Sequence, residues 1–292
     1  MKVFFSFFLT FSAIYSFSQN GNYEFIGTLQ LSDKNFISYK LKLSTTESEK
    51  FTGETITDFS GEHRTVSKVS GSFNKKKKTI SFIESKNIST KSNFENANFC
   101  FITVNNAFLK IKNNKSIIQG EFIGKYPNGK KCANGNVFLV GSEQLYKRLD
   151  NVSKKISIIK PNDEKLKEGI DAKILANEAN NNILKSEENL KINWSSNSVV
   201  FDIWDTQKED GDKVSILVNG KVFKKNVVVK NDKQTFSVPF QENEMTITII
   251  AENEGGIPYN TAQILLKDTK ENFPIMTGLR QGEKVFIVLK KN

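Results

Sequence analysis

The sequence has one histidine, His63, and this scarcity removes most histidine-dependent chemistry. A zinc site built from two histidines is excluded. A serine or cysteine nucleophile would need His63 as its base, but His63 lies in a loop-like Gly-Glu-His-Arg stretch, and no Gly-x-Ser-x-Gly motif occurs. We therefore assign no catalytic residue and expect that the protein is not an enzyme.

Arginine is almost as scarce, although the net charge is +10. Arg64, Arg148 and Arg280 are the three arginines, so lysine carries nearly all of the positive charge. Reading of base edges and bidentate binding of phosphate favour the planar guanidinium of arginine. The lysines are also spread along the chain, and the densest run, 75–78, is typical of a solvated hairpin turn. We expect no nucleic-acid partner, while attraction to anionic polymers stays open.

After the N-terminal stretch the sequence has no long apolar run, and the apolar run at the N-terminus is itself short. Lys2 precedes an apolar stretch over 3–17, and Ser16 and Ser18 supply small residues at the −3 and −1 positions of a cleavage site. This pattern predicts a signal peptide at 1–18. A retained anchor helix is the alternative, which the shortness of the run disfavours. We expect a secreted or periplasmic, envelope-associated protein whose mature chain has no membrane span.

Only two cysteines occur, Cys100 and Cys132. Because export removes the chain from the reducing cytosol, an isolated pair most simply forms one disulfide bond. The alternative is a pair of buried thiols. The sequence therefore predicts a Cys100–Cys132 disulfide within the first half of the chain.

The first half alternates between apolar and polar residues with a period of two. Tyr39, Leu41 and Leu43 alternate with lysines, and the stretches around 80–82 and 99–103 repeat the pattern. Turn residues separate these stretches, as in Pro127-Asn128-Gly129. Short strands at near-regular spacing predict an all-β domain at 19–141, an antiparallel barrel or sandwich.

The middle and the end of the chain differ from each other in composition and in their apolar pattern. Ser142 is a suitable N-cap for a short helix, and the rest of 142–192 is polar, so we expect a partly helical linker there. From 193 to 292, alternating strands follow one another at 199–203, 214–218, 236–240, 245–249, 262–266 and 285–289. This number of strands in so few residues predicts a second domain, a sandwich of two antiparallel sheets.

An acidic segment in the second domain is a candidate calcium site. Asp205, Asp210 and Asp212 lie within reach of one hairpin and could begin a shell of oxygen ligands for calcium. An Asp-Gly turn without a metal is the alternative. Trp204 stands beside these residues on the strand face opposite Val199 and is a candidate binding platform if that face is exposed. No other cofactor is expected.

Residues 192–268 resemble a known module. Trp204-Asp205, Glu209-Asp210-Gly211-Asp212, Asn219-Gly220 and the stretch 251–262 (Ala-Glu-Asn-Glu-Gly…Asn-Thr-Ala) are similar to an uncharacterised β-sandwich module that recurs in exported proteins of Gram-negative bacteria. The resemblance implies architecture and export, not an activity. The first domain is more faintly similar to small lipocalin-like barrels, although it lacks their Gly-x-Trp opening.

We expect a non-catalytic binding or accessory protein, with a glycan or another surface polymer as partner. Two alternatives stay open: a carrier of small apolar ligands that uses the N-terminal barrel, and a glycoside hydrolase-like enzyme. An exposed strip of aromatic side chains beside the acidic loop favours the first function, a closed apolar cavity favours the carrier, and two facing carboxylates in a cleft favour the hydrolase.

Overall fold

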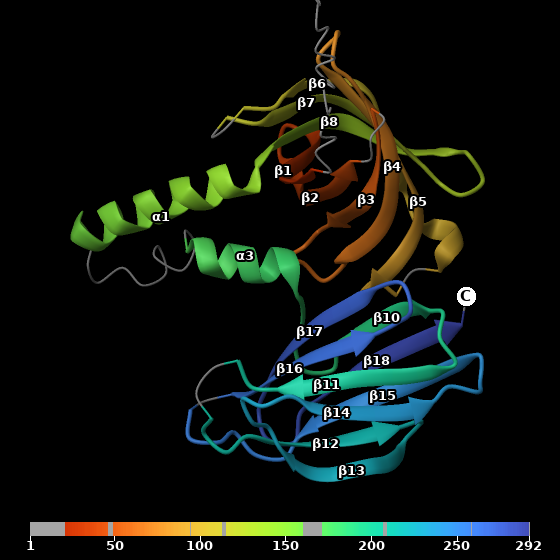
Figure 1. Cartoon of the computed structure of the whole chain (residues 1–292), viewed down its shortest axis with the longest axis vertical. Helices are drawn as coiled ribbons and strands as arrows, with labels where there is room; N and C mark the ends of the chain where they lie inside the picture. The colour runs from red at the N-terminus through yellow and green to blue at the C-terminus, as the bar shows by residue number, and fades with distance from the viewer. Residues whose placement is uncertain are drawn as a thin grey trace, which may run out of the picture.

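The structure is a computed structural model that describes residues 21–45, 49–93, 95–112, 115–159, 171–206, 209–257 and 259–291. Its described elements form a barrel, a pair of helices and a β-sandwich (Figure 1). The predicted signal peptide at 1–18 lies outside the described residues. Among the helices that are described, none combines the length and the apolar character needed to cross a membrane.

Within the described residues, eight antiparallel strands close into the N-terminal barrel. Each strand pairs with the next one in the chain, and the last pairs with the first. The prediction of a barrel or a sandwich is thus resolved in favour of the barrel. The strands are β1 (Asn22–Ser32), β2 (Asn35–Thr45), β3 (Lys50–Thr57), β4 (Thr65–Asn74), β5 (Thr79–Thr90), β6 (Phe101–Lys110), β7 (Ile117–Lys125) and β8 (Lys131–Gly141), with a 3₁₀ turn at Asn96–Asn98.

The interior of the barrel is packed with apolar side chains. Alternate residues of every strand point inward, as Tyr39, Leu41 and Leu43 of β2 do, and together they form one buried cluster. Small barrels of eight strands are ordinarily just wide enough for side chains to fill them. The predicted disulfide is confirmed: Cys100 and Cys132 are bonded, with their Cα atoms 5.9 Å apart, close to the end of the β6–β7–β8 sheet.

Two helices follow the barrel and cover part of its outside. They are α1 (Ser142–Ile159), which begins at the serine predicted to cap it, and α3 (Ala172–Asn180), capped by the Asp171 carboxylate. Ala179 of α3 is fully buried against Ile26 and Ile56, which point outward from β1 and β3. The prediction of helices in the polar middle segment is therefore confirmed, and α3 is held against the barrel by its apolar residues.

The C-terminal part is a sandwich, as predicted, and each of its two described layers has five strands. One layer has the order β13-β12-β15-β18-β10, and the other β14-β11-β16-β17-β9. The strands are β9 (Asn182–Leu184), β10 (Asn189–Trp194), β11 (Ser198–Trp204), β12 (Lys213–Val218), β13 (Lys221–Val228), β14 (Gln234–Pro239), β15 (Glu244–Ala251), β16 (Asn260–Lys267), β17 (Asn272–Leu279) and β18 (Lys284–Lys291). Trp194, Phe201 and Leu289 are among the side chains buried between the layers.

Two details differ from the sequence prediction. The layers are not wholly antiparallel, because β10 runs parallel to β18 and β9 parallel to β17. Strand β17 was also not predicted, since Pro274 interrupts its pattern. Pro274 is tolerated because the missing N–H faces β9, and the pairing with β9 starts one residue later, at Ile275. The Pro274 carbonyl on that side accepts a hydrogen bond from Asn182 Nδ2 instead.

The barrel and the sandwich share one hydrogen-bonded sheet. Ser89 and Thr90, at the end of β5, pair with Ile192 and Lys191 of β10. Through this contact the barrel strands and one sandwich layer form a continuous sheet of 13 described strands. Strand β9 and the start of β10 come from the segment 142–192, where the composition gave no indication of strands.

Candidate functional site

The outer face of the barrel carries a row of exposed aromatic and amide side chains. Phe108 of β6 and Phe138 of β8 both pair with Gln119 of β7, so the three side chains form one row across the sheet. Phe108 is 48% exposed and Phe138 is 47% exposed. Large apolar side chains in such numbers on one exposed face are typical of a binding surface.

Strand alternation explains why these phenylalanines point outward. Leu109 and Leu139, the next residues in their strands, are buried in the barrel interior. Since successive side chains point to opposite faces of a strand, Phe108 and Phe138 must face solvent where no helix covers them. Helices α1 and α3 cover a different part of the outside, over Ile26.

A second row and a third row extend the same face. Asn136 of β8 pairs with Gln30 of β1, which pairs in turn with Phe36 of β2, and Phe36 is 55% exposed. Ile123 of β7 pairs with Asn134 of β8. We call this surface the phenylalanine–amide face and define it by Gln30, Phe36, Phe108, Gln119, Ile123, Asn134, Asn136 and Phe138.

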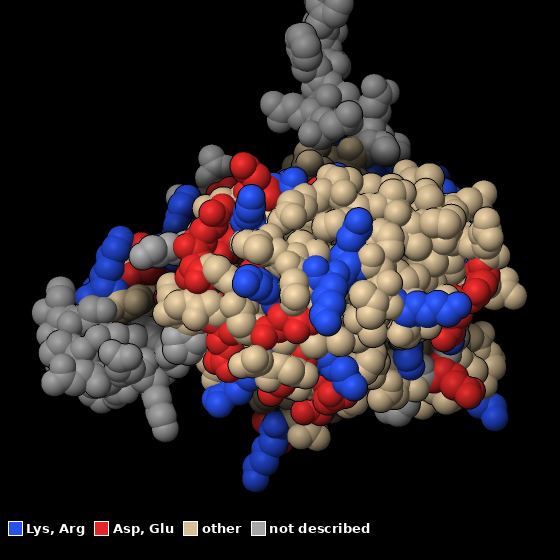
Figure 2. Space-filling model, turned by 90° about the horizontal axis from the view of Figure 1, so that it is seen from below, with Lys and Arg blue, Asp and Glu red and all other residues tan. Residues whose placement is uncertain are grey.

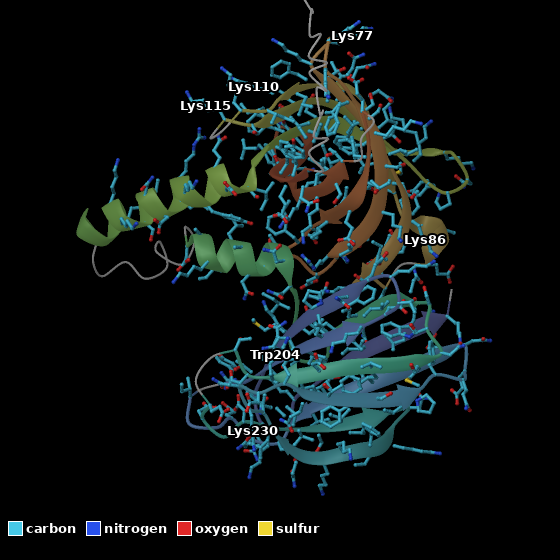
Figure 3. The ribbon with its side chains drawn as sticks, viewed as in Figure 1. Lys77, Lys86, Lys110, Lys115, Trp204 and Lys230 are labelled. Carbon is cyan, nitrogen blue, oxygen red and sulfur yellow. A yellow bond between two sulfur atoms is a disulfide. The ribbon has the colours of Figure 1, made fainter. Side chains whose placement is uncertain are left out.

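Charged side chains stand around this face more than within it. Lys125 and Lys131 are paired at one end of the β7–β8 hairpin, and Lys110 of β6 lies toward the other end. Figure 3 shows Lys110 and Lys77 at the barrel end of the molecule. Glu121, which pairs with Asn136, is the carboxylate within the rows. The face therefore offers aromatic rings, amide donors and acceptors, and lysines at its ends.

The three aspartates of the candidate calcium site lie at one end of the sandwich. They belong to the loop between β11 and β12, which packs against the loop between β15 and β16. Asp212 is almost fully buried and Asp205 is buried, whereas Asp210 is half-buried. Among the described residues, no group of three or more His, Cys, Asp or Glu side chains is close enough to hold one metal ion.

The surroundings of Asp212 disfavour its charged form. Burial raises the pKa of Asp212 to about 6; the charges of Asp210 and Asp205 add to this effect, and the N–H of Thr261 opposes it. Figure 2 shows acidic and basic side chains interspersed over the face of the molecule that it views, without a field of one sign. The concentration of carboxylates in this loop is thus local.

Trp204 lies at the end of β11, on the outward side of its strand. Phe201 and Ile203 are buried in the core, while Trp204 is half-buried and lies outside the core cluster. The ammonium group of Lys233 stands 4.5 Å from the centre of its ring. This cation–π contact occupies one face of the indole. For Trp204 to act as the predicted binding platform, a sugar ring would have to displace Lys233 from that face.

One buried polar cluster was missed at the sequence level. Glu84 of β5 lies inside the barrel, where its carboxylate accepts hydrogen bonds from Tyr39 Oη at 2.7 Å, Thr55 Oγ1 at 2.6 Å and the Ile102 N–H at 2.8 Å. Burial raises the pKa of Glu84, although these three donors oppose the effect. Alternation could have indicated it, because Glu84 has the same parity as the buried Ile80 and Phe82.

A polar cleft of about 330 Å³ lies where the barrel meets the sandwich. Asn87 and Thr90 of β5 line one side, and Asn193 of β10 lines the other. The cleft contains one carboxylate, Glu95, among its described lining residues. Its described lining residues therefore do not include a facing pair of carboxylates of the kind that glycoside hydrolysis uses.

Comparison with known proteins gave no relative: no family model, no curated protein and no solved structure matches this chain. The kinship of residues 192–268 with a module of exported proteins consequently stays a prediction. The geometry of the described residues is the basis for the function proposed below.

Proposed function

We propose that the protein is an exported, non-catalytic binding protein whose phenylalanine–amide face binds a glycan. The observation that carries this proposal is the row Phe108–Gln119–Phe138 on an uncovered face of the barrel. Aromatic rings offer flat apolar surfaces for the C–H faces of sugar rings, and each amide side chain can both donate and accept hydrogen bonds. This strip supports glycan binding, although it lies on the barrel and not beside the acidic loop, where the sequence led us to expect it.

The lysines at the ends of the face favour a glycan with acidic groups. Lys110 lies at one end, and Lys125 and Lys131 lie at the other, so a chain crossing the face would meet positive charge at both ends. The overall charge of +10 would add a long-range attraction toward such a polymer. We therefore name an acidic polysaccharide as the partner.

The packed barrel interior argues against the carrier of small apolar ligands. The inward side chains of β1–β8 form a continuous buried cluster that includes Phe25, Phe51, Phe82 and Phe122. A carrier needs an internal cavity of some 300 Å³ or more for a drug-sized ligand. The inward side chains of this barrel pack against one another, which favours the outer surface for binding.

Export is supported by the disulfide together with the N-terminal pattern. A disulfide persists in oxidising compartments, and the Cys100–Cys132 bond is formed in this fold. We expect cleavage after Ser18, so that the mature protein begins at Gln19. The intact mass of the protein recovered from the cell envelope or medium checks this; a species that still carries Met1 contradicts it.

The binding proposal is tested on a glycan array and then in solution. The mature chain should bind acidic polysaccharides such as polygalacturonate, and the double variant Phe108→Ala/Phe138→Ala should lose this binding, because both rings are removed without disturbing the core. The variant Val222→Ala is the matched control, since Val222 is also an exposed apolar residue of a strand, 64% exposed, but on β13 of the sandwich. Its binding should equal that of the wild type.

Other outcomes would contradict the proposal in separable ways. An array without signal would show that the protein does not bind the glycans tested, while unchanged binding by the double phenylalanine variant would place the site elsewhere. Size-exclusion chromatography with light scattering covers a third outcome. If the wild type is a dimer and the double variant a monomer, the face is a surface for self-association.

A further inference from the structure

The loop between β11 and β12 holds two carboxylate oxygens that are buried and have no hydrogen-bond partner among the described residues. They are Oδ1 of Asp210 and Oδ1 of Asp212. A buried anionic oxygen without a partner is strongly unfavourable, because it has lost its hydration and gained nothing in exchange. Such atoms in a native fold point to a group that completes them.

Hydrogen bonds to Oδ2 of each carboxylate fix the direction in which its Oδ1 points. Asp210 Oδ2 accepts hydrogen bonds from the N–H groups of Gly256 at 3.1 Å and Ile257 at 2.7 Å. Asp212 Oδ2 accepts one from the N–H of Thr261 at 2.7 Å. Both carboxylates are therefore held by the β15–β16 loop, and their remaining oxygens cannot turn toward these donors.

Gly255 shows that the two free oxygens converge on one point. A Cβ atom on Gly255 would lie 2.6 Å from Asp210 Oδ1 and 2.7 Å from Asp212 Oδ1. Both oxygens therefore face the same space beside the Gly255 Cα, where one cation can approach the two of them. The backbone of Gly255 has φ +59°, and the absence of a Cβ lets the two carboxylates approach it closely. A larger residue there would fill the space in which a cation could stand.

A third unpartnered oxygen belongs to a neutral side chain nearby. Asn260 is fully buried, and its Nδ2 donates to the carbonyls of Lys213 and Asn253 at 2.9 Å each. These two acceptors fix which end of the amide is nitrogen. Asn260 Oδ1 then remains without a partner among the described atoms. Asn260 is linked to Asp212 in two ways: its Nδ2 bonds the carbonyl of Lys213, which follows Asp212, and its chain neighbour Thr261 donates to Asp212.

We propose that this loop pair binds one calcium ion, with Asp210 Oδ1 and Asp212 Oδ1 as its charged ligands and Asn260 Oδ1, peptide carbonyls and water completing the shell. Carboxylate and amide oxygens are hard ligands, which suit calcium and magnesium rather than zinc or copper. Irregular loops with carbonyl ligands fit the flexible coordination of calcium better than the octahedral geometry of magnesium. This inference does not rest on the glycan proposal.

Asp205 enters as a neighbouring charge and not as a ligand. Its interaction with Asp212 is electrostatic, and no group of three described carboxylates converges on one point. The proposed shell therefore keeps two of the three aspartates that the sequence suggested and adds an asparagine. Two charged ligands suggest affinity in the range of extracellular modules, about 10⁻⁴–10⁻³ M, which suits a protein outside the cytoplasm.

The test measures calcium binding to the full mature chain after treatment with a chelator. Isothermal titration calorimetry with calcium chloride should show one site, and the unfolding midpoint should rise with calcium and fall back with chelator. Asp212→Asn should weaken binding by tenfold or more, as should Asp210→Asn. Without calcium, both variants should melt at or above the wild-type midpoint, because they relieve the repulsion between the carboxylates.

Asp232→Asn is the matched control, since Asp232 is an exposed aspartate in the neighbouring β13–β14 loop. It should bind calcium as the wild type does. No heat of binding and no shift of the midpoint at roughly 10 mM calcium, tenfold above the upper end of the expected range, would overturn the proposal. So would binding that survives in both Asp210→Asn and Asp212→Asn, or magnesium binding as tight as calcium binding. If Asp212→Asn does not fold, the half-buried Asp210→Asn decides.

Discussion

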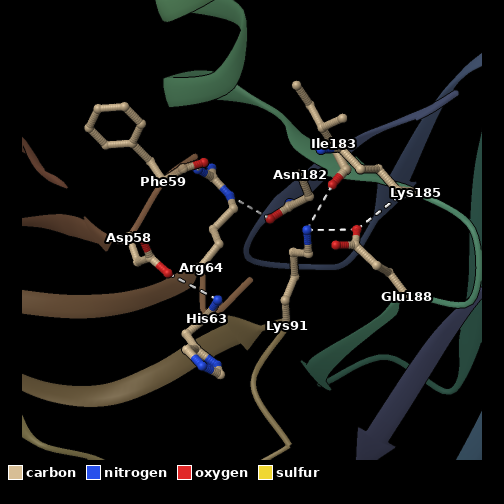
Figure 4. Close-up of polar contacts among 9 residues, drawn as sticks. All are labelled: Asp58, Phe59, His63, Arg64, Lys91, Asn182, Ile183, Lys185 and Glu188. Carbon is tan, nitrogen blue, oxygen red and sulfur yellow. Dashed lines mark hydrogen bonds and ion pairs between the residues drawn. The ribbon is translucent and has the colours of Figure 1, made fainter. Parts of the chain in front are cut away.

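Arg64 of the barrel donates a hydrogen bond of 2.9 Å from Nε to Oδ1 of Asn182, 118 residues later in the chain (Figure 4). The same guanidinium donates from Nη1 to the carbonyls of Phe59 at 3.2 Å and Glu178 at 3.0 Å. Arg64 is nearly fully buried at this junction of barrel, helix α3 and strand β9. Its planar fork satisfies three acceptors from three segments at once.

Replacing Arg64 should destabilise the whole protein. Arg64→Ala would remove the Arg64 donors from three oxygens at this buried junction, and we expect a loss of about 2–4 kcal/mol in the free energy of unfolding. Arg64→Lys should recover only part of it, because an ammonium group cannot match the fork. Urea unfolding measures the change, and Arg148→Ala on the exposed side of α1 is the control. Equal stability of Arg64→Ala and Arg148→Ala would contradict this role.

Lys91 makes further contacts at the same junction between the barrel and the sandwich. Lys91 Nζ donates to the Ile183 carbonyl at 3.1 Å and forms an ion pair of 2.7 Å with Glu188 (Figure 4). Together with the β5–β10 pairing, these contacts join the barrel to the sandwich through backbone and side chains alike. We expect a single cooperative unfolding transition for the wild type and two separate transitions when Arg64→Ala and Lys91→Ala are combined.

Loss of the disulfide should weaken the barrel. The Cys100–Cys132 bond closes a loop with a sequence separation of 32 residues. In the chain-entropy model this contributes roughly 3–4 kcal/mol. The double variant Cys100→Ser/Cys132→Ser should therefore unfold at lower urea concentration, as should the wild type under reducing conditions. A change below about 1 kcal/mol would show that the bond does not stabilise the fold in the way that the model requires.

Glu84 should make the folded protein less stable as pH rises, whereas a salt-bridged acid makes it more stable. Burial raises its folded-state pKa above the ordinary value of 4.5, so the folded state binds its proton more tightly than the unfolded state. Stability is then highest below pH 4.5 and falls as pH rises through the folded-state pKa. Glu84→Gln cannot ionise, and its amide can face the hydroxyls of Tyr39 and Thr55 while its oxygen still accepts from the Ile102 N–H.

The measurement is the free energy of unfolding of both proteins from pH 4.5 upward. The difference between Glu84→Gln and the wild type should grow in favour of the variant as pH rises. Glu121→Gln, which changes an exposed acid on the outside of the barrel, should follow the wild-type curve. A constant offset between Glu84→Gln and the wild type would mean that Glu84 does not contribute to the pH dependence.

The docking of helix α3 can be tested by proteolysis. Ala179 is fully buried against Ile26, Ile56 and Phe59, so Ala179→Asp would place an unpaired charge in an apolar contact. We expect faster cleavage within 142–181, while the barrel and the sandwich remain resistant. Ile174→Asp is the control, because Ile174 is an exposed residue of the same helix. Equal cleavage rates for both variants would show that α3 is not held by Ala179.

Much of the fold follows from residues close together in the chain. Alternation along stretches such as Tyr39-Lys-Leu-Lys-Leu43 requires a strand with one buried face, whatever that face packs against. Ser142 likewise marked a helix start in the sequence, because serine is favoured at this position, and helix α1 begins there. The cysteine pair was predictable because only one pairing exists. These elements depend on short-range chemistry, so the sequence alone determined them.

Other features needed the tertiary structure, because their partners are distant in the chain. Pro274 is compatible with a strand only where β9 begins beside it, and nothing local indicates that position. Phe138 lies within a continuous apolar run, so its exposure depends on which part of the barrel the helices cover. The sequence determined that Asp210 and Asp212 lie in one loop. Only packing against the loop around Gly255 decided that two of their oxygens converge, since hydrogen bonds from residues more than 40 positions away hold them there.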